Sequence, residues 1–251
     1  MKWRIIDFTE NDAFMNMAID EAISESVARG DPPTIRFYGW RPSAVSIGYF
    51  QGIDEEVDLE KCRELCVDVV RRRTGGGAVY HDNAGEITYS VIAKEQVFSK
   101  DILASYREIC GWIIDSLGLL GIKSQFKPIN DIVAFDGDTL KKISGNAQTR
   151  RGGVLLQHGT ILYSVDVKGM FSILKVPSEK LRDKMIKEAG ERVTSVHRLS
   201  KASKDELYRA LISGFTADKD IFFDSLTKNE ITRANSLAIE RYRKKEWNFL
   251  R

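Results

Sequence analysis

Cysteine and proline are scarce in this sequence, and long apolar runs are missing. Its 251 residues include three cysteines, Cys62, Cys66 and Cys110, which form neither a CxxC pair nor a disulfide framework. Together with the three histidines they lack the clustered spacing of a zinc site. No run approaches the roughly 20 apolar residues of a membrane span, and the amino terminus lacks a signal-peptide core. We therefore expect no structural metal, no membrane association and a reduced, cytoplasmic setting.

An excess of charge of one sign is also missing. The chain has 38 basic and 36 acidic residues, which give a formal net charge of +2. Two basic runs, residues 71–73 and 241–245, leave nucleic-acid binding open as an alternative, but such runs usually form solvated faces. We expect no nucleic-acid partner, and any site for an anion must be local.

What the sequence does contain is enough apolar material for a large core. Hydrophobic residues make up 43% and charged residues 29% of the chain, which excludes a disordered or fibrous protein. No internal repeat, low-complexity tract or Pro/Gly/Ser linker marks a boundary. We predict a single domain that spans residues 1–251.

The first part of the chain alternates helical and strand-like patterns. Asn11 or Asp12 is placed to cap a helix that runs toward Gly30. Residues 34–40 and 44–50 are rich in β-branched and aromatic side chains, and the short turn between them predicts a hairpin. Asp58 can cap a short helix, after which an apolar run leads into the arginines and glycines of residues 71–77.

Strands then gather before a mainly helical last third. Residues 87–93 predict a strand, residues 103–120 an amphipathic helix, and residues 132–165 an antiparallel meander with turns at 136–138 and 152–153. Alternating βαβ units are missing from this pattern. We therefore predict an α+β fold with a mixed, mainly antiparallel sheet flanked by helices, and a doubly wound nucleotide fold is disfavoured.

Three adjacent glycines, Gly75, Gly76 and Gly77, follow the first basic run. Glycine permits positive φ, and successive backbone N–H groups in such a turn can bind an anion. The segment is no Walker A loop, because no Gly-Lys-Ser/Thr follows, and Tyr80 stands where GxGxxG requires its third glycine. On its own, a run of this kind is more often a plain tight turn.

Three segments together carry a more specific signal: Arg72-Arg73-Thr74-Gly75-Gly76-Gly77-Ala78-Val79-Tyr80-His81-Asp82, then Asn130-Asp131, then Lys141-Lys142-Ile143-Ser144-Gly145-Asn146-Ala147. In these the chain resembles the catalytic domain of the lipoate-protein ligase A family, within the biotin/lipoate ligase superfamily. The signature of that family is similar to R-R-x-[ST]-G-G-G-A-V-[FY]-H-D, followed by N-D and K-[IV]-S-G-x-A. The resemblance also includes residues 15–21 and 157–160, so it covers most of residues 1–200.

The resemblance implies a fold like that of class II tRNA synthetases and biotin ligases. It also implies an ATP-dependent lipoate-protein ligase, which converts lipoate to lipoyl-AMP with the help of Mg²⁺ and passes the lipoyl group to a carrier lysine. The carriers would be the E2 subunits of 2-oxoacid dehydrogenases and the glycine cleavage H protein. Negative charge that gathers on the phosphate during adenylation is stabilised by fixed cations and N–H dipoles.

The resemblance assigns roles to single residues. Lys142 matches the motif lysine that contacts the α-phosphate and the acyl carbonyl, and Arg72 with the glycine backbone suits the phosphate. Asp131 is a candidate for holding Mg²⁺ or the nucleotide. His81 is expected to form a fixed pocket wall, since it and its neighbour Asp82 point to opposite faces of a strand. The residues implied for nucleotide and lipoate binding are Arg72, Gly75, Gly76, Gly77, Ala78, Val79, Tyr80, His81, Asp82, Asn130, Asp131, Ser144, Gly145 and His158.

Several alternatives stay open. An octanoyltransferase of the same fold would move an acyl chain from acyl-carrier protein through a cysteine thioester without ATP. Residues 148–150 and 157–159 look like that group, but no cysteine lies around residues 130–135, where its nucleophile is expected. His158 is equally compatible with an acyl tunnel and with a structural role. Biotin ligase is disfavoured because the GRGRxGR motif is absent, and a non-enzymatic ligand-binding module is the remaining alternative.

One departure from the family concerns the carboxy-terminal part. Many ligases of this family carry an additional carboxy-terminal domain, and this chain ends soon after its last predicted helix. We therefore expect a separate small accessory subunit. The sequence does not show whether lipoate or octanoate fills the pocket, because the length of a tunnel depends on side chains that only the fold brings together.

Overall fold

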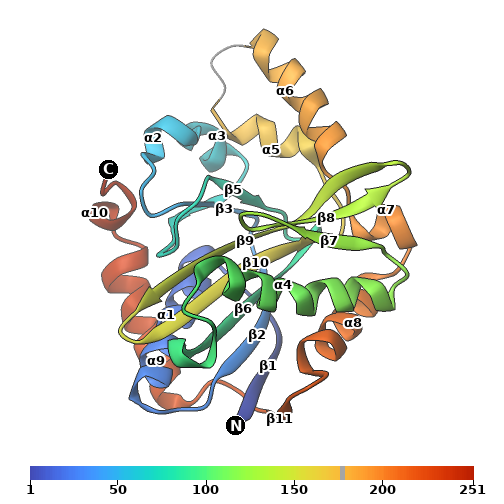
Figure 1. Ribbon diagram of the computed structural model, residues 1–251. Coiled ribbons are helices and arrows are strands. Elements are labelled where there is room, and N and C mark those ends of the chain that lie inside the picture. Colours follow the sequence, from blue (N-terminus) through green and yellow to red (C-terminus); the bar gives the residue numbers. More distant parts are fainter. Residues whose placement is uncertain (176–178) are drawn as a thin grey trace.

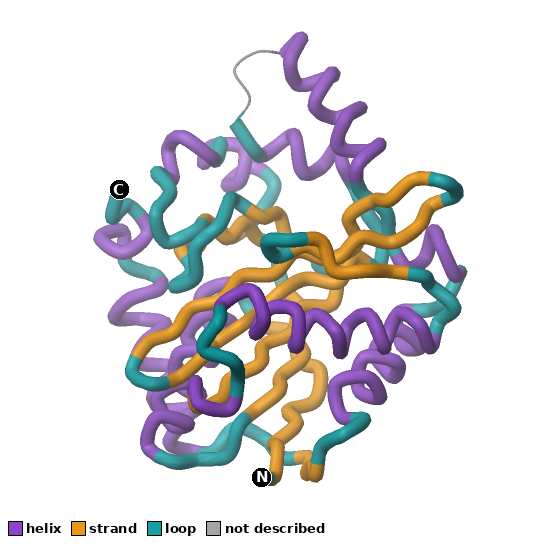
Figure 2. Tube along the Cα trace, viewed as in Figure 1, coloured by secondary structure: helices purple, strands orange, loops and turns teal. Residues whose placement is uncertain are grey.

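The computed structural model describes residues 1–175 and 179–251. A large mixed sheet runs through it, with the strand order β11-β1-β2-β6-β10-β9-β8-β7 (Figures 1 and 2). Its strands are β1 (Lys2–Asn11), β2 (Thr34–Trp40), β6 (Glu86–Lys94), β7 (Ser124–Lys127), β8 (Asp131–Asp136), β9 (Thr139–Arg151), β10 (Val154–Leu162) and β11 (Asp220–Phe223). A small sheet has the order β4-β3-β5, with β3 (Ala44–Ile47), β4 (Asp68–Arg71) and β5 (Val79–His81).

Helices connect and cover these sheets. They are α1 (Ala13–Arg29), α2 (Ile53–Glu56), α3 (Leu59–Glu64), η1 (Glu95–Val97), α4 (Ile102–Leu119), α5 (Val167–Ile173), α6 (Glu179–Arg192), α7 (Val196–Ser200), α8 (Lys204–Thr216), α9 (Lys228–Leu237), the π-helical turn η2 (Ala238–Tyr242) and α10 (Lys245–Asn248). Among the described residues, no helix is long and apolar enough to span a bilayer.

The caps of the helices follow from the sequence. The carboxylate of Asp12 accepts a hydrogen bond from the N–H of Met15 at the start of α1, and Gly30 ends that helix in the left-handed conformation. Asp58 accepts from the N–H of Lys61 at the start of α3. Both predicted caps are confirmed.

Two apolar clusters cover opposite faces of the large sheet. On one face, α4 and α8 pack on residues such as Phe37, Tyr89 and Leu155. On the other face, α1, α9 and η2 pack on residues such as Ile92 and Leu156. Figure 1 shows α4 and α8 in front of the sheet and α1 behind it. Burial on both faces fixes the register of the central strands, because a slip by one residue would exchange the two faces.

The antiparallel meander is confirmed. β8 pairs with β9 and β9 with β10, so that Asp131 lies opposite Gly145 and Ala147 lies opposite His158. A register shift between Ile132 and Val133 places the segment around Lys142 at an irregularity of this ladder. The predicted fold class, a mixed and mainly antiparallel sheet flanked by helices, is confirmed as well.

Two expectations were wrong. β2 and β3 do not form a hairpin, because β2 pairs in the large sheet while β3 pairs in the small sheet. Parallel crossovers also exist, since β1 pairs parallel with β2 across α1 and β3 pairs parallel with β4 across α2 and α3. The sequence did not predict β1, because its charged residues obscure the pattern of a buried strand. One of them, Arg4, is nevertheless buried in an ion pair with Glu230, at 2.6 Å.

Candidate active site

A cavity of about 330 Å³ lies between the small sheet and the large sheet. Ser46 and His81 reach it from the small sheet, and Tyr38 and His158 reach it from the large sheet. Its walls are formed by Met17, Tyr38, Trp40, Ser46, Arg72, Gly75, Gly76, Gly77, Ala78, Val79, Tyr80, His81, Thr88, Asn130, Lys142, Gly145, Asn146, Ala147, His158, Gly159, Thr160, Leu162, Met170 and Val193. The sequence segments that carry the family resemblance therefore meet in one place.

The loop between β4 and β5 forms one wall of the cavity. Gly76 has a φ of 96°, which favours glycine. A Cβ atom at Gly48 would lie 1.9 Å from the carbonyl oxygen of Gly76, so the loop can fold over β3 only because residue 48 has no side chain. Among described residues, the N–H groups of Gly75, Gly76 and Gly77 donate to no protein acceptor. These amides can receive an anion.

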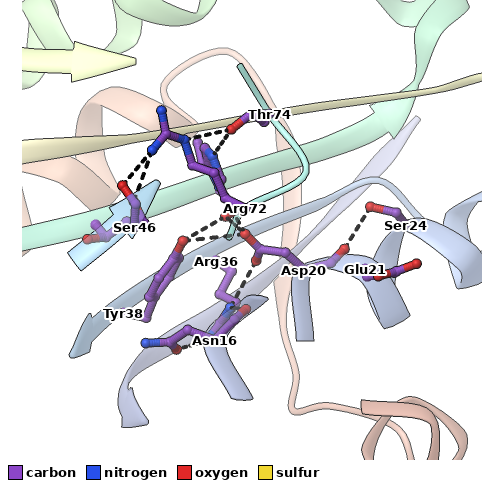
Figure 3. A network of polar contacts seen from close by, with 12 residues as sticks. Asn16, Asp20, Glu21, Ser24, Arg36, Tyr38, Ser46, Arg72 and Thr74 are labelled. Atoms are coloured by element: carbon purple, nitrogen blue, oxygen red, sulfur yellow. Dashed lines mark hydrogen bonds and ion pairs between the residues drawn. The ribbon is translucent and has the colours of Figure 1, made fainter. Parts of the chain in front are cut away.

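Arg72 holds this loop in place. Its Nε donates to the Thr74 hydroxyl at 3.1 Å, and its terminal nitrogens donate to the carbonyl and hydroxyl of Ser46 and to the carbonyls of Gly75 and Gly77. All five guanidinium N–H groups are thus used. Figure 3 shows the side chain between Ser46 and Thr74. Burial lowers the pKa of Arg72 to about 10, so it stays charged at neutral pH. The sequence predicted that Arg72 would donate to a phosphate. In the structure its donors are all used by the protein, and Arg72 holds the glycine loop in place.

The other two arginines of the run are also bound by protein groups: one is buried against backbone carbonyls, and one forms an ion pair. Arg71 is fully buried and donates to the backbone carbonyls of Gly48, Trp247 and Asn248. Arg73 forms an ion pair with the buried carboxylate of Glu21 at 2.8 Å. The basic run is therefore no solvated face.

Lys142 on β9 supplies the exchangeable cation of the site. Its ammonium lies 2.7 Å from a carboxylate oxygen of Asp131, and the side chains are 42% and 31% exposed. A Cβ atom at Gly145 would lie 2.9 Å from the Lys142 Nζ, so glycine makes room for the lysine along the strand. Asp131 itself does not line the cavity and acts as the partner of the lysine.

The predicted role of Asp131 as a Mg²⁺ ligand lacks support. Across residues 1–175 and 179–251, no group of three or more His, Cys, Asp or Glu side chains is arranged to hold a metal. Magnesium binds through one or two carboxylates together with phosphate oxygens. The carboxylate available here is already neutralised by an ammonium. The side chains of these described residues alone do not make a metal site.

His158 lies at the centre of one polar chain. Its Nε2 is 2.8 Å from the Thr74 hydroxyl, and its Nδ1 is 3.4 Å from a carboxylate oxygen of Asp20. Burial lowers the pKa of His158, while the hydrogen bond and charge of Asp20 oppose the change. Burial acts to raise the pKa of Asp20, but the hydrogen bond to His158 and the charge of Arg36 leave that pKa lowered. Figure 3 shows Asp20 beside Arg36 and Tyr38.

His81 lies at the centre of a second polar chain. Its Nδ1 is 2.7 Å from a carboxylate oxygen of Glu86, and its Nε2 is 2.9 Å from the Ser46 hydroxyl. The ring stacks on Trp40, with centroids 3.9 Å apart. As expected, Asp82 is not its partner. The Asp82 carboxylate instead accepts the N–H of Ala84.

Most of the predicted site residues line the cavity, and three do not. These three are Asp82, Asp131 and Ser144, the last of which is fully buried beside Asn146. Several functional candidates were missed: Asp20, Ser46, Thr74, Glu86 and Asn146. Thr74 and Asn146 lie within the motif segments. For Asp20, Ser46 and Glu86 the available signal was their polarity within apolar helices and strands, where buried polar groups need partners.

Comparison with known proteins identifies the family. A model of the lipoyl protein ligase A/B catalytic domain matches residues 12–216. The chain belongs to this family. A bacterial relative, octanoyltransferase LipM of Geobacillus kaustophilus (strain HTA426), is 34% identical over 99% of this chain and 98% of its own. Further bacterial relatives carry the same name.

Solved structures of ligases share the fold. A bi-partite lipoate protein ligase from Thermoplasma acidophilum, described with its E2 lipoyl domain, matches with a TM-score of 0.90 and 37% identity over 99% of this chain and 96% of that chain. A crystal structure of lipoate-protein ligase A bound with ATP matches with a TM-score of 0.84 and 34% identity, over 99% of each chain. The chain is thus an enzyme of the lipoate ligase and transferase family, and the comparisons support lipoyl or octanoyl transfer.

In this lipoyl ligase A/B domain, the cysteines lie away from the cavity. All three belong to the described part of the chain, and none lines the cavity. Cys110 is buried in α4, and burial raises the pKa of its thiol to about 12. Burial raises the pKa of the Cys62 thiol to about 11, whereas Cys66 is exposed. Neither buried thiol has the low pKa of a nucleophilic cysteine.

Proposed function

We propose that this chain forms lipoyl-AMP from lipoate and ATP and transfers the lipoyl group to a lysine of a lipoyl-carrier domain. One observation carries the proposal: the cavity holds an exchangeable lysine and three unpartnered glycine amides, but no thiol among its described lining residues. This set of groups suits an anionic nucleotide and not a covalent thioester.

Adenylation needs positive charge where the phosphate gains negative charge. The carboxylate oxygen of lipoate attacks the α-phosphorus of ATP, and pyrophosphate leaves with the electrons of the broken bond. The amides of Gly75 to Gly77 are aimed by the bracing of Arg72, so they need little reorganisation. The Lys142 ammonium can exchange Asp131 for a phosphate oxygen, because a half-exposed ion pair is weak.

The acyl chain would occupy the apolar part of the cavity. Met17, Tyr38 and Trp40 line it from α1 and β2, and Leu162 and Met170 line it from β10 and α5. Such walls bind an aliphatic chain by removing apolar surface from water. They suit lipoate and octanoate alike.

ATP is part of the proposal because the related lipoate-protein ligase A binds it. Magnesium would travel with the phosphates of ATP and neutralise part of their charge. Among the described residues the side chains alone form no metal site, so the phosphates of ATP would have to supply ligands to the ion.

Octanoyl transfer is the second candidate, and the names of several relatives favour it. In that reaction the acyl chain would arrive on acyl-carrier protein and leave on a carrier lysine without ATP. A cysteine nucleophile is the missing part, since no thiol lines the cavity in the described chain. The family shown by the comparisons admits both reactions, and the residues of the cavity favour the ligase.

The proposed partners are lipoyl-carrier domains. The Thermoplasma acidophilum ligase is described with its E2 lipoyl domain and as bi-partite. We extend both features to this chain, which gives an E2 lipoyl domain as acceptor and a separate small subunit as a helper. The glycine cleavage H protein is a further predicted acceptor.

One experiment decides between the two reactions. The purified chain is incubated with an apo lipoyl domain and either lipoate with ATP or octanoyl acyl-carrier protein without ATP, and the products are weighed by mass spectrometry. The ligase proposal expects pyrophosphate and lipoyl-AMP from the first mixture. Acylation of the domain in the second mixture alone would overturn it. Adding a candidate accessory subunit to the first mixture tests whether transfer needs it.

A further inference from the structure

A chain of three polar side chains opens on the cavity from the small sheet. The Ser46 hydroxyl on β3 lies 2.9 Å from Nε2 of His81 on β5, and Nδ1 of His81 lies 2.7 Å from the carboxylate of Glu86 on β6. All three residues are at most 4% exposed, and Ser46 and His81 line the cavity. This is the arrangement of a hydroxyl, an imidazole and a carboxylate in which each group orients the next.

The hydrogen bonds assign the protons. The Glu86 carboxylate also accepts from the Thr88 hydroxyl at 2.7 Å, and because it offers only acceptors, Nδ1 of His81 carries the proton. In the neutral ring Nε2 is then an acceptor, and the Ser46 hydroxyl donates to it. Ser46 Oγ also accepts from Arg72 at 3.2 Å. One lone pair of this hydroxyl therefore remains.

A second chain in the same protein provides a comparison. Thr74, His158 and Asp20 have the same order of groups. Thr74, however, is fully buried and does not line the cavity, and the contact between His158 and Asp20 is 3.4 Å long. Only the Ser46 chain presents its hydroxyl to the cavity and has a short bond between imidazole and carboxylate.

We propose that Ser46, His81 and Glu86 take a proton from the ammonium of the carrier lysine, so that the resulting amine can attack the acyl carbonyl. This rests on the second step of the proposed function. The amine nitrogen bonds to the acyl carbon, and the bond from that carbon to the phosphate oxygen of AMP breaks, with the electron pair leaving on AMP. The ammonium of the carrier lysine first gives one proton to Ser46 Oγ while the proton of Ser46 moves to Nε2 of His81. The second proton of the nitrogen leaves with the phosphate of AMP as the amide forms.

The reaction needs such a base. A lysine amine has a pKa of about 10.4 and is mostly protonated at neutral pH, so it attacks only after losing a proton. Lys142 serves as the cation that faces Asp131 or the phosphate, so it is not placed to act as this base. The imidazolium that forms at His81 is stabilised by the buried Glu86 carboxylate, and Trp40 fixes the plane of the ring.

The groups that surround His81 support this assignment. The titratable or charged side chains that face it are Glu86 on β6, Arg72 after β4 and His158 on β10. Arg72 donates to the same hydroxyl that His81 binds, so the cation polarises Ser46 without competing for the imidazole. Ser46 would touch the amine, and His81 and Glu86 act through it.

The test distinguishes the loss of a catalytic base from a general loss of the folded structure. Preformed lipoyl-AMP is mixed in a single turnover with either an apo lipoyl domain or hydroxylamine, which is already unprotonated at neutral pH. With Ser46→Ala and His81→Gln, transfer to the domain should slow about 100-fold at pH 7. Capture by hydroxylamine should change little, and the defect should shrink as the pH rises toward the pKa of lysine. Equal losses with both nucleophiles, or a defect that does not depend on pH, would overturn the proposal.

Matched variants complete the design. Ser116→Ala removes another buried hydroxyl, which bonds only to the carbonyl of Trp112 in its own helix, and should leave both rates unchanged. Glu86→Gln keeps the shape but removes the charge that stabilises the imidazolium, and should slow the domain reaction less than His81→Gln does. If His81→Gln does not fold, Ser46→Ala decides.

The outcome also distinguishes this inference from the proposed function. If the wild-type chain transfers from lipoyl-AMP but does not make it from ATP, only the ligase assignment fails. If the variants transfer to the domain as fast as the wild type, only the inference fails. If the wild type, tested with the accessory subunit present, acylates the domain neither from lipoyl-AMP nor from an octanoyl thioester, both fail.

Discussion

Two walls of the same cavity hold a cation in opposite ways. On the wall of the small sheet, Arg72 is buried and gives all its N–H groups to protein acceptors. On the wall of the β8–β9 hairpin, Lys142 is half exposed and has one carboxylate partner, Asp131. The first cation shapes the backbone that faces the ligand, and the second is available to the ligand itself.

The difference follows from the cost of losing each partner. Removing a buried, saturated guanidinium leaves several carbonyls without donors, and each unsatisfied buried group costs about 1–3 kcal/mol. Breaking a half-exposed ion pair costs about 0–1 kcal/mol. Evidence for chemistry should therefore be sought at the weakly held cation, and evidence for preorganisation at the strongly held one.

The largest expected effect is at the exchangeable cation. Lys142→Ala should lower the rate of lipoyl-AMP formation by about 100- to 1,000-fold, because a charge aimed at the transition state is lost. Release of pyrophosphate measures the rate, and thermal unfolding should change little. Lys141→Ala is the matched control, since Lys141 pairs with Asp136 at 3.0 Å and does not line the cavity. Equal losses of the adenylation rate in Lys142→Ala and Lys141→Ala would contradict a special role for Lys142.

The second effect is on stability at the braced cation. Arg72→Met should lower the free energy of unfolding by about 3 kcal/mol, since it strands the acceptors of the glycine loop. Arg72→Lys should not restore it, because an ammonium lacks the planar fork. Urea denaturation measures both. Arg41→Ala, at a side chain that is 76% exposed, serves as the control, and an Arg72→Met variant as stable as this control would contradict the bracing role.

A third variant tests the loop without changing charge. Gly48→Ala should cost about 1–3 kcal/mol and slow adenylation, because the new methyl group collides with the carbonyl of Gly76 and displaces the loop. Adenylation and denaturation are measured together. Gly111→Ala is the control, as its Cβ meets no atom within 4 Å in α4. A Gly48→Ala enzyme with normal activity would show that the position of the loop does not matter.

The smallest effect is the pH dependence of stability. The pKa of His158 is lowered by burial, so the unfolded chain binds its proton more readily than the folded chain does. Stability should therefore fall as the pH drops below about 6.5, the pKa of a free histidine. The pKa of Asp20 is also lowered, which adds a further loss below about pH 4. The loss of stability below about pH 6.5 should be absent in His158→Gln. Thermal unfolding at several pH values measures this difference.

Local patterns predicted much of the fold. Residues 34–40, 132–135 and 154–165 have the composition of strands, and most of each range is a strand, while Asp12 and Gly30 mark the ends of α1. β1 and β11 could not be found in this way, because β1 carries a buried charge, Arg4, whose partner Glu230 comes from a distant segment. That residues 1–251 form one domain stays a prediction.

The candidate site was predictable only as a set of motifs. The glycine run and Lys142 stand out in the sequence, but their proximity depends on the pairing of β5 in the small sheet. β5 has only three residues, which is too short for a pattern that predicts this pairing. The direction of Arg72 was also hidden, because its acceptors are mostly backbone carbonyls that every residue possesses. Ser46 and Glu86 lie 35 and 5 residues from His81, so no spacing connected them.

The contacts of α10 have a consequence for the order in which the molecule matures. The side-chain oxygen of Asn248 accepts a hydrogen bond from the backbone N–H of Arg71, and its backbone carbonyl accepts one from the Arg71 guanidinium. The Trp247 indole N–H donates to the Arg71 carbonyl. The strand that leads into the glycine loop, β4, is thus held by residues that follow it by 176 and 177 positions in the chain. During synthesis on a ribosome, Arg71 would therefore stay without these partners until residues 247 and 248 have left the exit tunnel.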